Sequence, residues 1–176
     1  LASPVGMVAD GDGHFVVSNY GDNTLSKITP AGKILPFVAG LNRPQGITRD
    51  NVGNLYVANS GANNIVRVTP AGVQSIFATG LNNPYALKFN SQGHLLVTNA
   101  GNNSIVQITP AGVVSTLTRS ISSAVQTIKY DGQGNLYVVS TDATLNKLDP
   151  AGNLTTLASG IGGPTGLAVN SAGEAF

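Results

Sequence analysis

The sequence repeats itself every 40 residues, and this repeat limits the possible folds more than any other feature. The tripeptide Pro-Ala-Gly occurs four times with that spacing, at residues 30–32, 70–72, 110–112 and 150–152. A series of prolines runs in phase with it, with Ala124 in place of one member: Pro4, Pro44, Pro84 and Pro164. Self-similarity with a period of roughly 20 to 50 residues is typical of solenoids, propellers and related repeat architectures.

Each repeat contains four short apolar stretches that are separated by turn residues. In the second copy we expect strands over residues 46–49, 55–58, 65–69 and 74–78. Turn chemistry lies between them, because Asp or Asn can begin a turn, Pro presets φ and Gly accepts a positive φ. Short, β-branched runs between such residues indicate strands rather than helices. Four antiparallel strands in a unit of this length are typical of a propeller blade.

Large and small residues recur at fixed positions of the repeat. We expect the large ones to fill the space between stacked blades, because one blade cannot bury both of its faces alone. We expect the small ones to let main chains approach one another on the innermost strands. The large residues are Leu25, Ile65, Ile105 and Leu145, together with Met7, Ile47, Leu87, Ile128 and Leu167; the small ones are Gly6, Gly46, Ala86, Thr127 and Gly166.

These observations predict an all-β fold, a β-propeller of four-stranded antiparallel blades. We expect one domain over residues 1–176, with repeats at 4–43, 44–83, 84–123 and 124–163 and a truncated copy at 164–176. The chain would then hold about four blades and part of a fifth. We expect it to be a portion of a propeller of about six blades. The alternatives are an oligomer whose protomers complete each other's rings and a small closed ring that uses its terminal overlap as a clasp.

The second repeat also resembles a known family. The string P-x-G-I-x-x-D-x-x-G-N-L-Y-V-A-N-S-G-x-N-x-I-x-R-V, from Pro44 to Val68, resembles the NHL repeat and is similar to streptogramin-lyase-like and gluconolactonase-like propellers. This resemblance implies a propeller of about six blades that binds proteins, glycans or RNA, or a metal-dependent lactonase or lyase. The family often has Asp after the second strand, whereas this chain has Asn19, Asn59, Asn99 and Ser140.

Composition narrows the functional classes. Charged residues are 10% of the chain and the net charge is +1, so the clustered basic surface of a nucleic-acid binder is absent from the sequence. The absence of cysteine excludes disulfides and Cys-ligated zinc. No apolar run is long enough to cross a bilayer, so we expect no membrane insertion. Richness in Gly, Asn, Ser and Thr favours an extracellular or cell-surface protein.

The residues that could carry chemistry fit structural roles better. His14 and His94 share a turn position with Asn54 and Asn135, which argues against a histidine metal site. Asp10, Asp50 and Asp131 share their position with Asn90 and Asn170, and Asp and Asn both form Asx turns. The sequence contains no nucleophile elbow, P-loop or dinucleotide fingerprint. We therefore predict no catalytic residue, no metal ligand and no cofactor.

Ligand-binding candidates lie where connections meet. We expect the Asn-rich loops at 19–23, 59–64 and 99–103 and the crossovers at 41–45, 81–85, 121–125 and 161–165 to share one face. Such loops concentrate function, although Asn in a tight loop can also serve only its own backbone. Two lysines at otherwise small positions are candidates to line the axis. The candidates are Arg43, Gln45, Asn59, Tyr85, Asn99 and Gln126, with the lysines Lys88 and Lys129.

The predicted function is a non-enzymatic binding or scaffold module that presents this face to a protein or glycan ligand. The first alternative is a metal-dependent lyase or lactonase, which would need His, Glu, Asp or Asn from several blades at one channel mouth. The second alternative is a self-assembling structural protein that associates through open strand edges.

Overall fold

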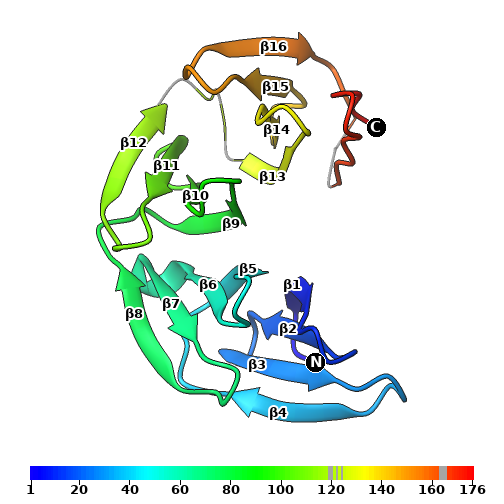
Figure 1. The fold of residues 1–176 in the computed structure, drawn as a ribbon, viewed down its shortest axis with the longest axis vertical. Helices are drawn as coiled ribbons and strands as arrows, with labels where there is room; N and C mark the ends of the chain where they lie inside the picture. Colours follow the sequence, from blue (N-terminus) through cyan, green and yellow to red (C-terminus); the bar gives the residue numbers. More distant parts are fainter. Residues whose placement is uncertain (119–120, 122, 124, 163–165) are drawn as a thin grey trace. The chain divides into compact units, whose positions relative to one another are not determined.

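The chain folds almost entirely into antiparallel β-sheet. The computed structural model describes residues 1–118, 121, 123, 125–162 and 166–176, with the side chain of Gln126 excluded. The described strands form four sheets of four strands, and within each sheet the strands pair in chain order (Figure 1). The all-β prediction and the four strands predicted for each repeat are therefore confirmed. No helix in the described residues is long and apolar enough to cross a membrane.

We call the four sheets blades 1 to 4. Blade 1 contains β1 (Pro4–Ala9), β2 (Phe15–Asn19), β3 (Thr24–Ile28) and β4 (Ile34–Val38). Blade 2 contains β5 (Pro44–Arg49), β6 (Leu55–Asn59), β7 (Asn64–Val68) and β8 (Gln74–Ala78), with the 3-10 turn η1 (Ser60–Ala62) between β6 and β7. Blade 3 contains β9 (Pro84–Phe89), β10 (Leu95–Asn99), β11 (Ser104–Ile108) and β12 (Val114–Thr118). Blade 4 contains β13 (Val125–Tyr130), β14 (Leu136–Ser140), β15 (Leu145–Leu148) and β16 (Leu154–Ala158).

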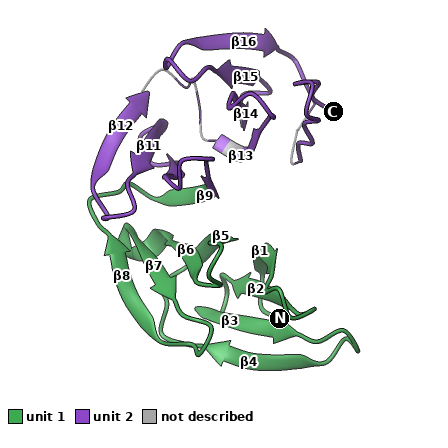
Figure 2. Cartoon of the chain, in the orientation of Figure 1, with its two compact units in different colours: residues 1–87 green, residues 88–176 purple. Residues whose placement is uncertain are grey.

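The chain divides into two compact units, and Figure 2 colours them separately. Unit 1 is Leu1–Leu87 and unit 2 is Lys88–Phe176, with the boundary inside β9. Blades 1 and 2 lie in unit 1. Blade 4 and all of blade 3 except the first residues of β9 lie in unit 2. Unit 1 therefore contains the space between blades 1 and 2, and unit 2 contains the residues that line the cavity between blades 3 and 4.

The core of unit 1 fills the space between blades 1 and 2. Leu25 and Val68 are fully buried in one apolar cluster that also contains Ile47. The innermost strands β1 and β5 approach closely at Gly6, where an added Cβ would lie 2.8 Å from the main-chain oxygen of Gln45. Large recurring residues thus pack between the blades, and a small one allows the close approach of main chains, as the repeat predicts.

Met7 departs from that prediction. Its side chain is 62% exposed, whereas Ile47 and Ile128 at the equivalent positions are 9% and 5% exposed. Ile47 packs into the cluster between blades 1 and 2. By the same strand geometry Met7 faces away from blade 2, and unit 1 has no third blade on that side to cover it. Burial at this position depends on a neighbouring blade and not on the residue alone.

The truncated fifth repeat forms a short hairpin-like segment in unit 2. Ala168 and Phe176 exchange two main-chain hydrogen bonds, and Val169 forms an isolated bridge with Ala175. The Tyr137 hydroxyl of blade 4 donates a 2.8 Å hydrogen bond to the Gly173 carbonyl. The last residues therefore begin another antiparallel pair beside blade 4.

Candidate functional site

The Asn-rich loops and the crossovers meet at one end of the strands in unit 1, as predicted. The Leu41 N–H donates to the Asn23 carbonyl over 3.1 Å, and the Arg43 N–H donates to Asn23 Oδ1 over 2.7 Å. One repeat later, the Leu81 and Asn83 N–H groups donate to Asn63 in the same way. We call this end of the strands the loop face.

Left-handed main-chain conformations recur in the loops and crossovers of both units. Among the described residues, the non-glycine residues with a positive φ lie 20 residues apart, and only position 123 is missing from the series. They are Ser3, Asn23, Arg43, Asn63, Asn83, Asn103 and Ala143. A left-handed φ is uncommon outside Gly, and Asn tolerates it best because its amide bonds locally. Asn23 and Asn63 are residues that suit this conformation. Nothing in the sequence indicated it at Arg43, where φ is 51°.

The predicted ligand-binding residues occupy different environments. Arg43 is exposed on the loop face, and Gln45 and Tyr85 at the crossovers are half-buried. Lys88 and Lys129, on the innermost strands β9 and β13, are exposed. Gln126 lies outside the residues whose side chains are described.

Asn59 and Asn99 are buried at the ends of β6 and β10. Asn59 Oδ1 accepts from the Asn42 N–H over 2.6 Å, and its Nδ2 donates to Asn64 Oδ1. Asn99 Nδ2 donates to Ser104 Oγ over 3.2 Å. Each buried amide therefore stabilises the conformation of the loop that follows its strand.

The opposite ends of the strands carry the predicted Asx turns. Asp50 Oδ1 accepts from the Val52 and Asn54 N–H groups over 3.0 and 2.8 Å. Asp131 has the same pattern with Gln133 and Asn135. Burial acts to raise the pKa of Asp50, but the hydrogen bonds from Asn54, Val52 and Tyr56 outweigh it, and the net pKa is below its ordinary value.

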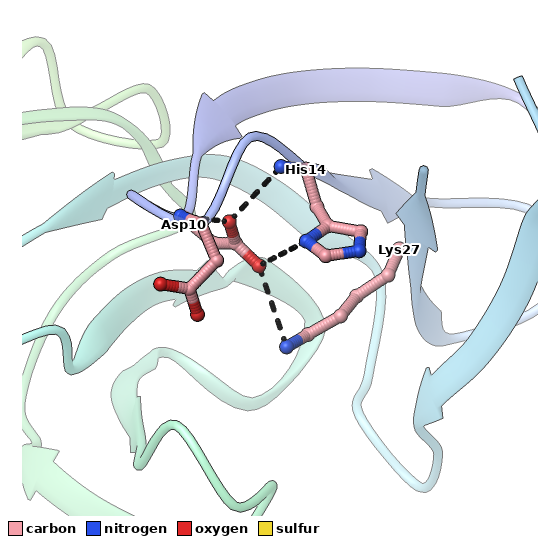
Figure 3. Close-up of polar contacts among 4 residues, drawn as sticks. Asp10, His14 and Lys27 are labelled. Carbon is pink, nitrogen blue, oxygen red and sulfur yellow. Dashed lines mark hydrogen bonds and ion pairs between the residues drawn. The ribbon is translucent and has the colours of Figure 1, made fainter. Parts of the chain in front are cut away.

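Charged residues gather in the space between blades 1 and 2, beside the Asp10 turn. The Lys27 ammonium lies 3.4 Å from Asp10 Oδ2, and His14 Nδ1 lies 3.6 Å from the same oxygen (Figure 3). Lys27 also stands 4.4 Å above the centre of the Phe37 ring. Asp10, Lys27, Phe37 and Arg49 line a cavity of about 250 Å³. The sequence did not predict this cluster, because Lys27 and Arg49 are far from Asp10 along the chain.

The equivalent space in unit 2, between blades 3 and 4, is larger and carries no cation among its lining residues. Its cavity measures about 550 Å³. Neutral side chains replace the charged ones of unit 1 at four lining positions, one of which is Asp12, with Gln92 as its equivalent. The other equivalent pairs are Asp10 and Asn90, Lys27 and Gln107, and Arg49 and Tyr130.

The lyase or lactonase alternative needs metal ligands from several blades at one channel mouth. The described residues contain no group of three or more His, Cys, Asp or Glu side chains that could hold a metal ion. His14 contacts one carboxylate, Asp10, and the turn that holds His94 has Asn90 in the equivalent place. The chemistry of these donors does not fit a divalent metal centre.

Comparison with solved structures identifies the fold. The chain is similar to virginiamycin B lyase from Staphylococcus aureus, with a TM-score of 0.82 and 19% identity over 98% of this chain and 68% of that one. It is also similar to a protein described as a gluconolactonase, with a TM-score of 0.82 and 18% identity over 98% of this chain and 70% of that one.

A third similar structure is a chain of the nidogen–laminin complex. It has a TM-score of 0.82 and 18% identity over 93% of this chain and 67% of that one. No protein-family model and no curated protein sequence matches the chain. The fold is the β-propeller of the streptogramin-lyase-like and NHL-like type, and this fold occurs in enzymes as well as in a protein complex.

Proposed function

We propose that the chain is a non-enzymatic binding or scaffold module that presents the loop face of unit 1 to a protein partner outside the cell or at its surface. The observation that supports this most strongly is the bonding of the loop face. Asn23 and Asn63 each hold the following crossover through a side-chain bond to its main chain. A surface ordered in this way loses little conformational entropy on binding, so more of its contact energy contributes to affinity.

The exposed side chains of the loop face indicate what it recognises. Arg43 is exposed at the centre of a crossover, and Asn42, Asn82 and Asn83 beside the crossovers are exposed amides. Arginine is enriched in protein interfaces, and amides suit peptide groups because they both donate and accept hydrogen bonds. The same amides also suit a glycan, which we retain as the second ligand class. The chain in the nidogen–laminin complex shows that a similar fold takes part in a protein assembly.

A matched pair of variants tests the proposal. Arg43→Ala removes a cation from the loop face, and Lys33→Ala removes an exposed cation from the β3–β4 turn at the opposite end of the strands. The purified chain would be screened against arrays of secreted proteins and of glycans by biolayer interferometry. We expect a protein ligand whose affinity falls about ten-fold or more with Arg43→Ala and stays unchanged with Lys33→Ala. Equal losses, or binding to glycans alone, would contradict it.

The metal-dependent lyase or lactonase is the second candidate, and the likeness in fold to virginiamycin B lyase and to the gluconolactonase is the observation in its favour. Its test is incubation of the chain with virginiamycin B and with gluconolactone, each with and without Mg²⁺. We expect no cleavage in any of the four reactions. Turnover that depends on Mg²⁺ would replace the binding proposal with the enzyme.

A further inference from the structure

The cavity between blades 3 and 4 has the properties of a small-molecule site. Its volume of about 550 Å³ falls within the range of roughly 300 to 1,000 Å³ that is usual for ligand pockets, whereas the 250 Å³ cavity of unit 1 falls below that range. It lies among the turns at the opposite ends of the strands from the loop connections, so it is separate from the loop face. Its occupation is therefore independent of the function proposed above.

An amide and a phenol, both half-buried, line this cavity. Gln107 on β11 and Tyr130 on β13 line it, and among the described residues no hydrogen bond joins either side chain to another group. A primary amide and a phenol both donate and accept hydrogen bonds. A ligand rich in hydroxyl groups has the same dual character, so it can satisfy both at once. The Tyr130 ring and the side chains of Leu96 and Leu117 supply the apolar surface against which C–H groups can pack.

The charges of the cavity disfavour charged ligands. Asp131 and Asp149 are its only ionisable acids among the lining residues, and no lysine, arginine or histidine lines it. An anionic ligand would meet repulsion from these two carboxylates, and Lys147, whose charge acts on Asp131, does not line the cavity. A cationic ligand would also bind weakly, because Asp131 already accepts hydrogen bonds from three N–H groups, two of them from Asn135. Asp149 likewise accepts the main-chain and side-chain N–H groups of Asn153.

We propose that the cavity between blades 3 and 4 binds an uncharged, polyhydroxylated small molecule of the size of one sugar ring, with Gln107 and Tyr130 as its hydrogen-bonding groups. Unit 1 shows how such a site is closed. There, Lys27 and Arg49 occupy the positions of Gln107 and Tyr130, and Phe37 occupies that of Leu117. These longer or bulkier side chains leave less than half the volume.

The test uses the full ¹⁵N-labelled chain and follows the Gln107 side-chain amide by two-dimensional NMR. Four neutral sugars are titrated: D-glucose, D-galactose, D-mannose and N-acetyl-D-glucosamine. D-glucuronate and D-glucosamine serve as the acidic and basic counterparts. We expect saturable shifts of the Gln107 amide with at least one neutral sugar, and binding of both charged sugars that is weaker by about ten-fold or more.

Variants assign the binding to this cavity. Gln107→Lys and Leu117→Phe each introduce the residue type of unit 1, and each should weaken binding by about ten-fold or more. Lys27→Gln in unit 1 is the matched control and should leave the affinity within about two-fold of the parent. Should Gln107→Lys fail to fold, Leu117→Phe still tests the site. Arg43→Ala should change nothing here, which separates this proposal from the loop-face function.

Three results would overturn the inference: no shift with any neutral sugar, tighter binding of D-glucosamine than of every neutral sugar, or unchanged affinity in a folded Gln107→Lys or Leu117→Phe variant.

Discussion

The spaces between blades 1 and 2 and between blades 3 and 4 are built from the same positions of the repeat but differ in chemistry. In unit 1, Lys27 pairs with Asp10 and covers the Phe37 ring, and the remaining cavity is about 250 Å³. In unit 2, Gln107 and Leu117 take the places of Lys27 and Phe37, and the cavity is about 550 Å³. The main-chain framework is the same, with four paired strands in every blade.

The difference separates two kinds of position in the repeat. Leu25, Ile65 and Ile105 share a position that keeps its apolar character, and these three residues are fully buried and hold consecutive strands and blades together. Positions that change character, such as Lys27 and Gln107, face the space between blades and decide whether it is closed or open. The residues that recur in every repeat therefore determine the fold of the blades. The residues that differ between repeats determine the chemistry of each space between blades.

The largest expected effect comes from the core of unit 1. Ile65→Ala should lower the free energy of unfolding by about 3 kcal/mol, because Ile65 is fully buried and its removal leaves a cavity. Leu145 is the equivalent residue in unit 2 and is only partly buried, so Leu145→Ala should cost about half as much. Guanidinium denaturation measures both, with the exposed Val52→Ala as the control. Equal costs would show that the two units are packed alike.

The left-handed loop residues should give the next largest effect. Asn63→Ala should cost about 1.5 kcal/mol, because alanine is strained at a φ of 54° and the bond to the Asn83 N–H is lost. Ala143 in unit 2 already stands at a φ of 65°. Ala143→Asn should therefore raise the free energy of unfolding by about 0.5 kcal/mol, and with it the melting temperature. Differential scanning calorimetry of both variants checks the pair, and destabilisation by Ala143→Asn would count against this explanation.

Two lysines at one position of the repeat should give a smaller contrast. Lys27→Gln removes an ion pair and a cation–π contact, and we expect it to cost about 1 kcal/mol. Lys147→Gln removes a cation–π contact at 5.8 Å from the Tyr137 ring and a charge that acts on Asp131 from a distance, and should cost less than about 0.5 kcal/mol. Urea denaturation at low and high salt distinguishes the two variants, because salt screens the ion pair and should narrow the difference between their losses of stability. A larger loss for Lys147→Gln would refute the assigned contacts.

The Asx turns should show the smallest effect and no difference between units. Burial would raise the pKa of Asp131, but hydrogen bonds from Asn135 and Gln133 and the charge of Lys147 lower it; at Asp50 hydrogen bonds lower the pKa against burial. A depressed folded-state pKa stabilises the fold above the unfolded value of about 3.9, and this stabilisation is lost as the pH falls through the folded value. Asp50→Asn and Asp131→Asn should therefore flatten the acid limb of the stability curve equally, each by less than about 1 kcal/mol. Denaturation at a series of acidic pH values measures this, and unequal flattening would mean that the turns differ.

The sequence predicted what depends on neighbours along the chain. Pro, Asp and Gly at fixed offsets indicated the turns, and the short β-branched runs between them indicated the strands, within one or two residues of β5 to β8. Local hydrogen bonds decide both features, so local sequence was sufficient. The shared loop face followed from the alternation of antiparallel strands.

Features that depend on distant residues were not predicted. The exposure of Met7 depends on which blade lies next to it, and the pairing of Lys27 with Asp10 depends on how β3 lies against the β1–β2 turn. The cavities depend on side chains from two blades at once. In each case the feature depends on a contact between residues of different strands or blades. The order of residues along the chain does not show which of them come into contact.

A high-resolution crystal structure of the free chain, with its ordered water, tests the central claim most directly. Buried waters occupy cavities that are polar and large enough to hold them. The account predicts Lys27 in contact with Asp10 in a space with little room for water, and several ordered waters bonded to Gln107 and Tyr130 between blades 3 and 4. The account would be contradicted by a dry, collapsed space in unit 2, or by Lys27 turned out to solvent above a hydrated cavity in unit 1.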